Sequence, residues 1–206
     1  MAPFCIDLVE KGFAVWNLEY RRIGEEGGGW PGTFHDVADG IDCLRILEKK
    51  YHLNLKQTLI IGFSSGGHLA LWAASRYKIH KNSVLIRKNP ISIHGVVSLA
   101  GVCDLKYFQN YDPECREIIT KLVNYTHYDE ACPTAFLPLN IKQILIGGDL
   151  DQDVPIETLK AYEKDAKRAG DIIEVHVVRD AGHFEFVVPG TDAHQKTVDE
   201  IRKFYR

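Results

Sequence analysis

The chain has 206 residues, of which 45% are hydrophobic and 26% are charged, and its formal net charge is −3. This balance is ordinary for one globular domain of roughly 100–250 residues, which can build a core without disulfides or metals. Lysine and arginine are scattered, which excludes a concentrated basic surface for nucleic acid, and no apolar stretch approaches the ~20 residues needed to span a bilayer.

Hydrophobic periodicity predicts helices and strands that alternate along the chain. The first helix covers 1–11, with Phe4, Leu8 and Val9 on one face. The elements that follow are a buried strand over 13–19, an amphipathic helix over 33–50, a strand over 59–62, a helix over 66–77, strands over 94–101 and 144–148, a helix over 157–169, a strand over 172–178 and a helix over 192–205.

The predicted strands are apolar throughout and most are separated by helices. This pattern is typical of an α/β fold with a mostly parallel sheet that is covered on both faces. Residues 102–140 are the exception, since they are polar and aromatic with no clear period. We expect them to form an excursion over one edge of the sheet, within a single domain that comprises residues 1–206.

The five cysteines are odd in number and far apart, and none forms a C-x-x-C pair. They are Cys5, Cys43, Cys103, Cys115 and Cys132. Their spacing predicts neither a zinc site nor a disulfide framework. We therefore expect reduced thiols in a cytoplasmic protein that uses no metal or cofactor.

Residues 62–66 read G-F-S-S-G between a predicted strand and a predicted helix. They fit G-x-S-x-G, a turn that holds its serine in a strained conformation at the carboxyl end of a strand. Both glycines are expected because a Cβ there would collide with the neighbouring strand or helix. Centring the pattern on Ser65 would put Phe63 where glycine is needed, so Ser64 is the predicted nucleophile. The Ser65 backbone N–H, at the helix start, can then donate to a developing oxyanion.

A serine hydroxyl needs an adjacent base, which a third group orients. With this turn the partners follow in the chain order serine, acid, histidine. Of the nine histidines, only His183 comes just after the carboxyl end of a predicted strand, in R-D-A-G-H-F. His127, in the excursion, is the one serious alternative. His68 lies inside the helix after the turn, where a packing role is the better interpretation.

The acid is expected in the loop after the strand I-L-I-G-G, which offers Asp149, Asp151 and Asp153. Their alternate spacing also suggests calcium. An EF-hand fails, however, because the sixth loop position is Val154 instead of glycine and the twelfth is Lys160 instead of glutamate. Position in the chain leaves the choice among the three aspartates open.

Five segments match a known family in the same order along the chain. They are N-L-E-Y-R-R (17–22), G-G-G-W-P-G-T (27–33), G-F-S-S-G-G-H-L-A (62–70), S-L-A-G-V-C-D-L (98–105) and A-G-H-F (181–184). Together they resemble the esterase/lipase-like α/β-hydrolases, which include kynurenine formamidases and small carboxylesterases. A weaker similarity extends to the catalytic domain of prolyl oligopeptidase-type peptidases.

The resemblance implies an α/β-hydrolase fold and acyl transfer from a small-molecule ester or amide. The acid loop is similar to the G-x-x-D-x-x-V-P of many members, which aligns the acid with Asp151. Asp151 would orient His183, and His183 would take the proton from Ser64 as the hydroxyl attacks the carbonyl. Four aromatic residues are predicted to bind substrate, with ordinary packing as the alternative: Trp30, Tyr107, Phe108 and Tyr111.

Two parts of the family pattern are missing. The family carries H-G-G-x-W ahead of this region, and its N–H groups complete the oxyanion hole. Three early strands are absent as well, so strand 13–19 must pair directly with strand 59–62 or leave an apolar edge unpaired. We expect a shortened form of a longer hydrolase with weak turnover, since each lost oxyanion donor costs about a hundred- to a thousand-fold in rate.

The leading interpretation is a serine carboxylesterase or aryl formamidase that acts on a small molecule. One alternative is a serine peptidase of the prolyl oligopeptidase type. The other is a non-catalytic α/β-hydrolase relative, which the missing oxyanion segment favours and the set of Ser64, His183 and Asp151 opposes.

Overall fold

The computed structural model describes residues 1–111, 113–124 and 126–205. At its centre lies a four-stranded sheet in the order β1-β2-β3-β4, in which all neighbouring strands are parallel. The strands are β1 (Leu59–Phe63), β2 (Gly95–Leu99), β3 (Lys142–Gly148) and β4 (Ile173–Val178). The prediction of a mostly parallel sheet in an α/β fold is confirmed.

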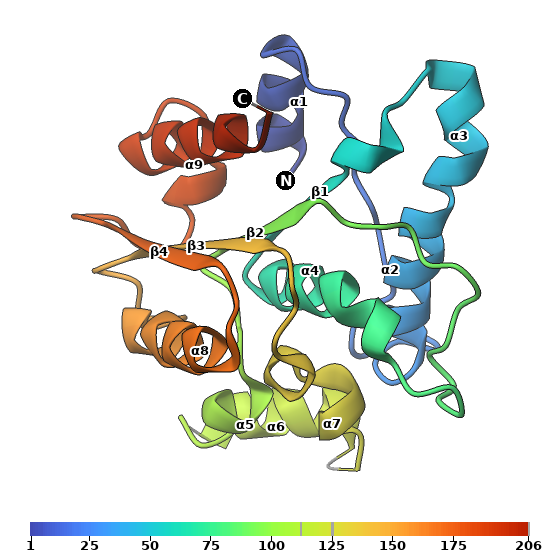
Figure 1. Ribbon diagram of the computed structural model, residues 1–206. Coiled ribbons are helices and arrows are strands. Elements are labelled where there is room, and N and C mark those ends of the chain that lie inside the picture. The colour runs from blue at the N-terminus through green and yellow to red at the C-terminus, as the bar shows by residue number, and fades with distance from the viewer. Residues whose placement is uncertain (112, 125, 206) are drawn as a thin grey trace.

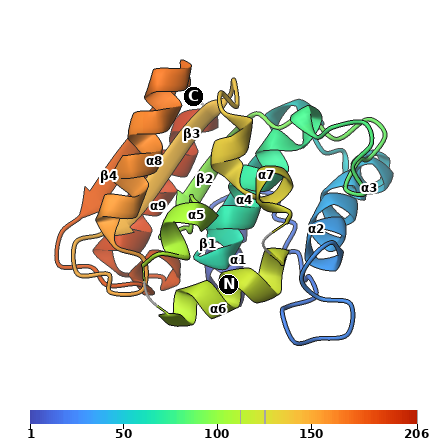
Figure 2. The same cartoon turned by 90° about the horizontal axis from the view of Figure 1, so that it is seen from below.

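Helices cover both faces of the sheet, as Figures 1 and 2 show. One face carries α1 (Ala2–Glu10) and α9 (Asp192–Arg202), and the other carries α4 (Ser65–Ser75) and α8 (Ile156–Ala169). Next to α4 lies α2 (Gly32–Asp42). Because helices lie on both faces, both sets of strand side chains are buried, which explains why the strands are apolar throughout.

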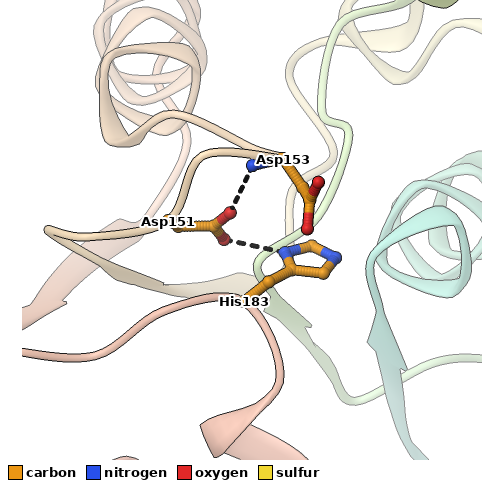
Figure 3. A group of neighbouring side chains, drawn as sticks. All are labelled: Asp151, Asp153 and His183. Carbon is orange, nitrogen blue, oxygen red and sulfur yellow. Dashed lines mark hydrogen bonds and ion pairs between the residues drawn. The ribbon is translucent and has the colours of Figure 1, made fainter.

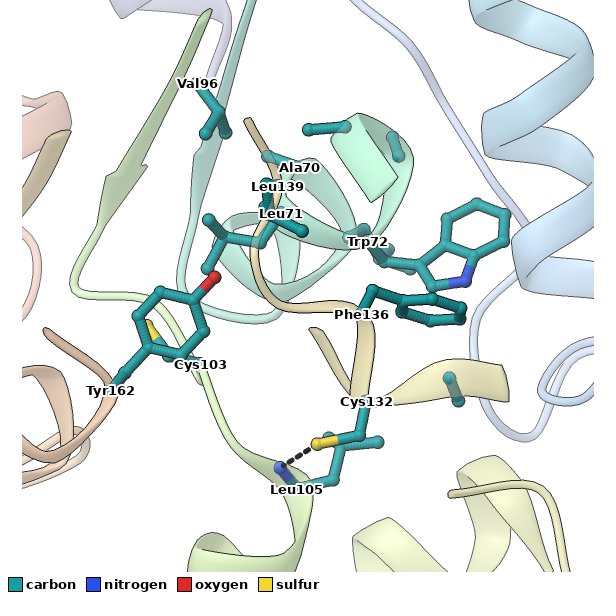
Figure 4. Close-up of a cluster of buried hydrophobic side chains, with 14 of the residues drawn as sticks. Ala70, Leu71, Trp72, Val96, Cys103, Leu105, Cys132, Phe136, Leu139 and Tyr162 are labelled. Carbon is teal, nitrogen blue, oxygen red and sulfur yellow. Dashed lines mark hydrogen bonds between the residues drawn. The ribbon is translucent and has the colours of Figure 1, made fainter. Parts of the chain in front are cut away.

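Side chains alternate between two cores along each strand. Val97 and Ile146 join the core beneath α1 and α9. Val96 and Leu145 point the other way, into the larger core that contains Trp72 of α4. Figure 4 shows part of this larger core, with labelled residues from α4, β2, α8 and the 102–140 segment.

The first helix forms as predicted, with one difference. Phe4 and Leu8 are buried against the α9 side of the sheet, whereas Val9 is 55% exposed. The helix ends before Gly12, whose φ of +91° is the left-handed conformation that favours glycine just past a helix. Val9 lies one position from Leu8, about 100° around the helix, and this rotation carries its side chain out of the buried face.

The predicted strand over 13–19 is wrong. The segment forms no strand, and its apolar side chains pack separately: Phe13 and Val15 lie against the α9-side core, while Leu18 packs beside Gly40 of α2. The Trp16 indole N–H donates to the Gly40 carbonyl, 2.9 Å away. Within the described residues β1 is therefore the edge strand of the sheet. Segment 13–19 does not pair with it, so the apolar strand β1 keeps one unpaired edge, which is the second of the two outcomes expected from the sequence.

The predicted helix over 33–50 is two helices. The first, α2, stops at Asp42, and α3 (Leu44–Tyr51) follows after Cys43. Val37 and Ile41 of α2 are buried as expected, whereas Leu44 is only half-buried. The apolar face of the predicted helix is therefore buried in α2 but not in α3.

The remaining predicted strands and helices are confirmed, with ends that shift by a few residues. The α8 helix is followed by Gly170 at φ +99°, as its sequence indicates. The predicted helices over 66–77 and 192–205 each finish in a short 3-10 turn, Arg76–Lys78 after α4 and Lys203–Tyr205 after α9.

The 102–140 segment is more regular than its sequence suggests. Its described residues form α5 (Leu105–Phe108), α6 (Pro113–Val123) and α7 (Tyr128–Ala131). They lie beyond α4 and α8 instead of over an edge of the sheet (Figure 1). The Trp72 indole N–H donates to the Glu130 carbonyl at 3.0 Å, which anchors α7 on α4.

None of the helices in the described ranges combines the length and the apolar character that crossing a membrane requires.

Candidate active site

The turn between β1 and α4 holds Ser64 in a strained conformation, with φ +55° and ψ −120°. Its N–H donates to the carbonyl of Leu99 at the end of β2, 2.9 Å away, and its own carbonyl accepts from the N–H of Gly67 at 2.9 Å. A non-glycine residue with positive φ costs of order 1–3 kcal/mol and persists only where neighbouring bonds impose it. These two bonds fix the serine at the carboxyl end of its strand.

Of the two glycines that flank the serine turn, Gly62 and Gly66, only Gly62 is needed to avoid a collision. A Cβ at Gly62 would lie 1.9 Å from the Gly66 carbonyl oxygen, whereas a Cβ at Gly66 would meet nothing within 4 Å. The expected collision at Gly66 is therefore wrong. The close contact falls one residue later, at Gly67, whose added Cβ would lie 2.7 Å from the Cα of Gly101. The first turn of α4 crosses the end of β2 through this glycine.

Three side chains from distant parts of the chain form one line of hydrogen bonds. Ser64 Oγ lies 3.0 Å from His183 Nε2, and His183 Nδ1 lies 2.8 Å from Asp151 Oδ2. Because a carboxylate only accepts, the network assigns the ring proton to Nδ1. Nε2 is then the acceptor for the serine hydroxyl. The structure thus brings together the three residues predicted as nucleophile, base and acid.

The loop after β3 presents one of its aspartates to the imidazole. Asp151 is buried, and its second oxygen, Oδ1, accepts from the N–H of Asp153 at 2.9 Å and of Val154 at 2.8 Å. Asp149 and Asp153 are exposed. Among the three aspartates of this loop, the structure therefore places against His183 the one that the family resemblance aligns with the acid, Asp151.

The loops that carry Asp151 and His183 are joined through their backbones. The N–H of Leu150 donates to the Ala181 carbonyl at 3.0 Å, and the N–H of Asp149 donates to the Val178 carbonyl at 3.2 Å. A Cβ at Gly148 would lie 2.0 Å from the same Ala181 oxygen. Only glycine allows this approach, which sets the acid loop beside the histidine loop.

Asp151, Asp153 and His183 could in principle hold a metal ion, since their ligand atoms lie within 4.8 Å of one another. Figure 3 shows why this set is poorly suited: both oxygens of Asp151 already accept hydrogen bonds, one of them from the imidazole. The other ring nitrogen of His183 faces the serine. A metal would have to break the contacts that orient the imidazole.

Ser65 is the first residue of α4, and its side chain is exposed. Its N–H has no carbonyl one helical turn earlier, so it is one of the unpaired donors at a helix start. Such a donor is available to a developing negative charge next to Ser64.

The four predicted substrate-binding aromatics lie outside the hydrogen-bonded group. Trp30 stacks on His127, with ring centroids 4.3 Å apart. Phe108 is buried in the larger core, while Tyr107 and Tyr111 are exposed on and just after α5. Their role in substrate binding stays a prediction.

The two other histidines that the sequence singled out have different surroundings. His127 is engaged in the stack with Trp30 and is not bonded to Ser64. His68 is buried, its Nε2–H donates to the Ala131 carbonyl at 2.9 Å, and burial lowers the pKa of its imidazole to about 4. His68 therefore packs between α4 and α7, as its position in the helix indicated.

Two aromatic rings beside His183 were not predicted as site residues. The Phe63 ring lies 4.8 Å from the imidazole and the Phe184 ring lies 5.2 Å from it, centroid to centroid. Phe184 is 62% exposed. Their positions next to Ser64 and His183 in the sequence are the signal that could have identified them.

A cavity of about 280 Å³ lies at the far end of α4, away from Ser64. Its wall includes Ala73, Ile91 and Leu139, together with Arg76, whose guanidinium pairs with Asp42 at 2.9 Å. It contains none of the three hydrogen-bonded residues of the candidate site.

The fold is that of the α/β-hydrolase esterases. Esterase B from Lactobacillus rhamnosis superposes with a TM-score of 0.84 at 18% identity, over 98% of this chain and 68% of that one. The acetyl ester-xyloside bifunctional hydrolase from Caldicellulosiruptor lactoaceticus gives 0.79 at 19% identity, over 98% and 75%. The esterase Est2 from Thermogutta terrifontis gives 0.72 at 20% identity, over 90% and 67%.

A family model described as BD-FAE matches residues 1–165, well over half of the chain. The chain therefore belongs to the BD-FAE family, which agrees with its resemblance to esterase-like α/β-hydrolases. Among curated proteins, the proline iminopeptidase PfmaB of Pestalotiopsis fici is 30% identical over 82 residues. That stretch covers 40% of this chain and 28% of PfmaB, so the chain spans only a small part of this relative.

Proposed function

We propose that the chain is a serine hydrolase that cleaves small carboxylic esters or aryl formamides through Ser64, His183 and Asp151. The observation that carries this proposal is the unbroken line of hydrogen bonds from the buried carboxylate through the imidazole to the hydroxyl. Membership of the BD-FAE family and the esterase fold support the reaction class.

In the proposed reaction, His183 Nε2 takes the Ser64 proton as Oγ bonds to the carbonyl carbon. Asp151 keeps the other ring proton on Nδ1 and stabilises the imidazolium that forms. The oxyanion accepts a hydrogen bond from the backbone N–H of Ser65. His183 then returns its proton to the leaving alcohol or amine, and a water molecule, activated by the same imidazole, releases the acyl group from Ser64.

The surroundings of His183 favour a small substrate with an apolar part. The Phe63 and Phe184 rings flank the imidazole, and exposed Leu150 stands in the neighbouring loop. Short-chain and aryl esters fit this setting, and an aryl formamide presents a similar ring. The names of Esterase B and the acetyl ester-xyloside hydrolase support esters as the first substrates to test.

A peptidase activity is the second candidate, favoured by the similarity to the proline iminopeptidase PfmaB. Such an enzyme must bind the α-ammonium group of its substrate. The exposed carboxylates of Asp149 and Asp153, on the same loop as Asp151, are the groups near the site that suit a cation.

The test is turnover by the purified chain of p-nitrophenyl acetate, N-formylkynurenine and proline p-nitroanilide. We expect ester or formamide hydrolysis that Ser64→Ala abolishes and that Ser92→Ala, at an exposed serine ahead of β2, leaves unchanged. Hydrolysis that survives Ser64→Ala contradicts the proposal. Turnover of the anilide alone selects the peptidase, and no turnover with any substrate selects the non-catalytic alternative.

A further inference from the structure

A second group of one histidine and two carboxylates lies between β4 and α9. Successive strand residues point to opposite faces, so Ile173 and Val175 enter the α8-side core while Glu174 and His176 face α9. Glu200 comes from α9 to meet them. These three residues are separate from Ser64, Asp151 and His183 and are not used by the proposed reaction.

The ligand atoms of this group converge without bonding to one another. His176 Nε2 lies 3.4 Å from Glu174 Oε2 and 3.3 Å from Glu200 Oε2. Both His176 Nε2 and Glu200 Oε2 are buried, and neither has a hydrogen-bond partner among the residues that the structure describes. Glu200 is fully buried, at 0% exposure. A buried carboxylate oxygen without a donor is costly, and such an atom aimed into a cluster of ligands calls for a cation.

The separations match a particular coordination geometry. Zinc binds imidazole nitrogen and carboxylate oxygen at about 2.0–2.2 Å, so two ligands at tetrahedral angles lie roughly 3.3–3.5 Å apart. The two distances from His176 Nε2 are of this size. A hydrogen bond between the same atoms would be shorter, near 2.8 Å.

The other carboxylate oxygens are already held. Lys196 and Lys203 lie 2.8 and 2.7 Å from Glu200 Oε1, and Lys142 lies 3.2 Å from Glu174 Oε1. Outer contacts of this kind orient ligand carboxylates around a metal. The three ammonium groups also oppose a cation, but each side chain is partly exposed, so water screens this repulsion.

We propose that Glu174, His176 and Glu200 form a binding site for a divalent transition metal of the zinc class. His176 Nε2 and one Oε2 from each glutamate supply three ligands, and a water molecule supplies the fourth, since Glu174 and His176 are partly exposed. The bound ion ties α9 to the edge strand β4. Because three lysines stand close by, the site binds its ion more weakly than a site with unpaired carboxylates.

The protonation states suit this role. Burial lowers the pKa of the His176 imidazole, against the opposing charge of Glu200, so the ring stays neutral and can donate a lone pair. Burial alone would raise the pKa of Glu200, but the hydrogen bonds from Lys196 and Lys203 lower it overall. The carboxylate is therefore ionised, as a metal ligand must be.

The test is titration of the untagged chain with Co²⁺, followed by displacement with Zn²⁺. We expect one saturable Co²⁺ site with the visible absorption of a four-coordinate ion, and a rise in unfolding temperature with Zn²⁺. Glu174→Gln and His176→Ala should each weaken binding about tenfold or more. Glu174 is partly exposed, so its variant tests the site even if His176→Ala does not fold.

Asp153→Asn is the matched control, because it alters the other cluster of possible ligands without touching this one. We expect it to leave Co²⁺ binding unchanged. Two results overturn the proposal: no saturable binding at millimolar Co²⁺, or a Co²⁺ spectrum that Asp153→Asn removes while Glu174→Gln and His176→Ala retain it.

Discussion

Two histidines, His176 in β4 and His183 after it, each lie near carboxylates, and their surroundings differ in one decisive respect. At His183 both ring nitrogens are engaged, one with Asp151 and one with Ser64. At His176 the nitrogen that faces two glutamates has no hydrogen bond within the described part of the chain. A histidine in a complete line of donors and acceptors is arranged to move a proton, whereas one beside a buried carboxylate oxygen that lacks a donor is arranged to bind a cation. The hydrogen bonds of each imidazole, more than the residue types around it, distinguish proton transfer at His183 from cation binding at His176.

The largest expected effect comes from removing the His183 imidazole, both of whose nitrogens are hydrogen-bonded. His183→Ala leaves Ser64 without a base, so we expect kcat for p-nitrophenyl acetate to fall by about 10⁴-fold or more. The exposed His80 serves as control, and His80→Ala should keep the original rate. Comparable losses in both variants would mean that the contact with Ser64 has no catalytic role.

The second prediction concerns the carboxylate that orients His183. Asp151→Asn retains an oxygen for the N–H groups of Asp153 and Val154 but no longer fixes the ring proton on Nδ1. We expect a loss in kcat of about 10³- to 10⁴-fold. Asp149→Asn, on an exposed residue of the same loop, should change kcat by less than about threefold. A larger loss in kcat for Asp149→Asn than for Asp151→Asn would show that Asp149, and not Asp151, is the acid.

His68 is a buried imidazole that is hydrogen-bonded to a backbone carbonyl instead of to a carboxylate or a serine. Its pKa is lowered to about 4 by burial, while the unfolded chain titrates near 6.5. Between these values only the unfolded state is protonated, so stability is present above about pH 6.5 and falls as the pH drops toward 4. The shift corresponds to a loss on the order of 3 kcal/mol.

Urea denaturation between pH 7 and pH 4 measures this loss. His68→Gln keeps a donor for the Ala131 carbonyl but does not titrate, so its free energy of unfolding should fall less over the same range. Carboxylates with a lowered pKa, such as Asp7 and Asp36, act mainly below about pH 4. His176, whose pKa is also lowered by burial, contributes equally to the variant and to the original chain, so the difference between their curves reports on His68. Parallel curves for the variant and the original chain would show that His68 is not the source.

The smallest expected effect concerns the aromatic ring on the open side of His183. Phe184 is exposed and lies against the imidazole, so Phe184→Ala should raise KM for aryl esters a few-fold and change kcat little. Val84→Ala, at an exposed apolar residue outside the site, is the control. An equal change in KM for acetyl esters of small alcohols would show that Phe184 does not contact the leaving group.

Much of the fold and of the site could be predicted from local pattern. The apolar runs of β2 and β3 and the Gly62–Ser64 turn are determined by residues close in sequence, and chain order then selects His183. The failed strand over 13–19 depends on a partner, because no apolar run forms a ladder without a neighbouring strand. In 102–140 the helices α5 and α7 were missed because four residues carry little periodicity, and such short helices are stabilised by contacts such as Trp72 with Glu130.

Other features that depend on residues far apart in sequence could not be predicted. The burial of Asp151 and its two N–H donors, which explain the choice that the family resemblance made, are visible only in three dimensions. The same is true of Glu200, which meets His176 through the packing of α9 on the sheet. Sequence spacing identified the residue types, and packing decided which of them meet.

The most direct test of the hydrolase mechanism is covalent labelling with a fluorophosphonate, which traps a serine only when its hydroxyl is activated. After digestion and mass spectrometry, we expect the adduct on the peptide that carries Ser64, formed rapidly in the original chain and at a small fraction of that rate in His183→Ala. An adduct confined to other residues, or labelling of Ser64 that is equally fast without His183, would contradict it.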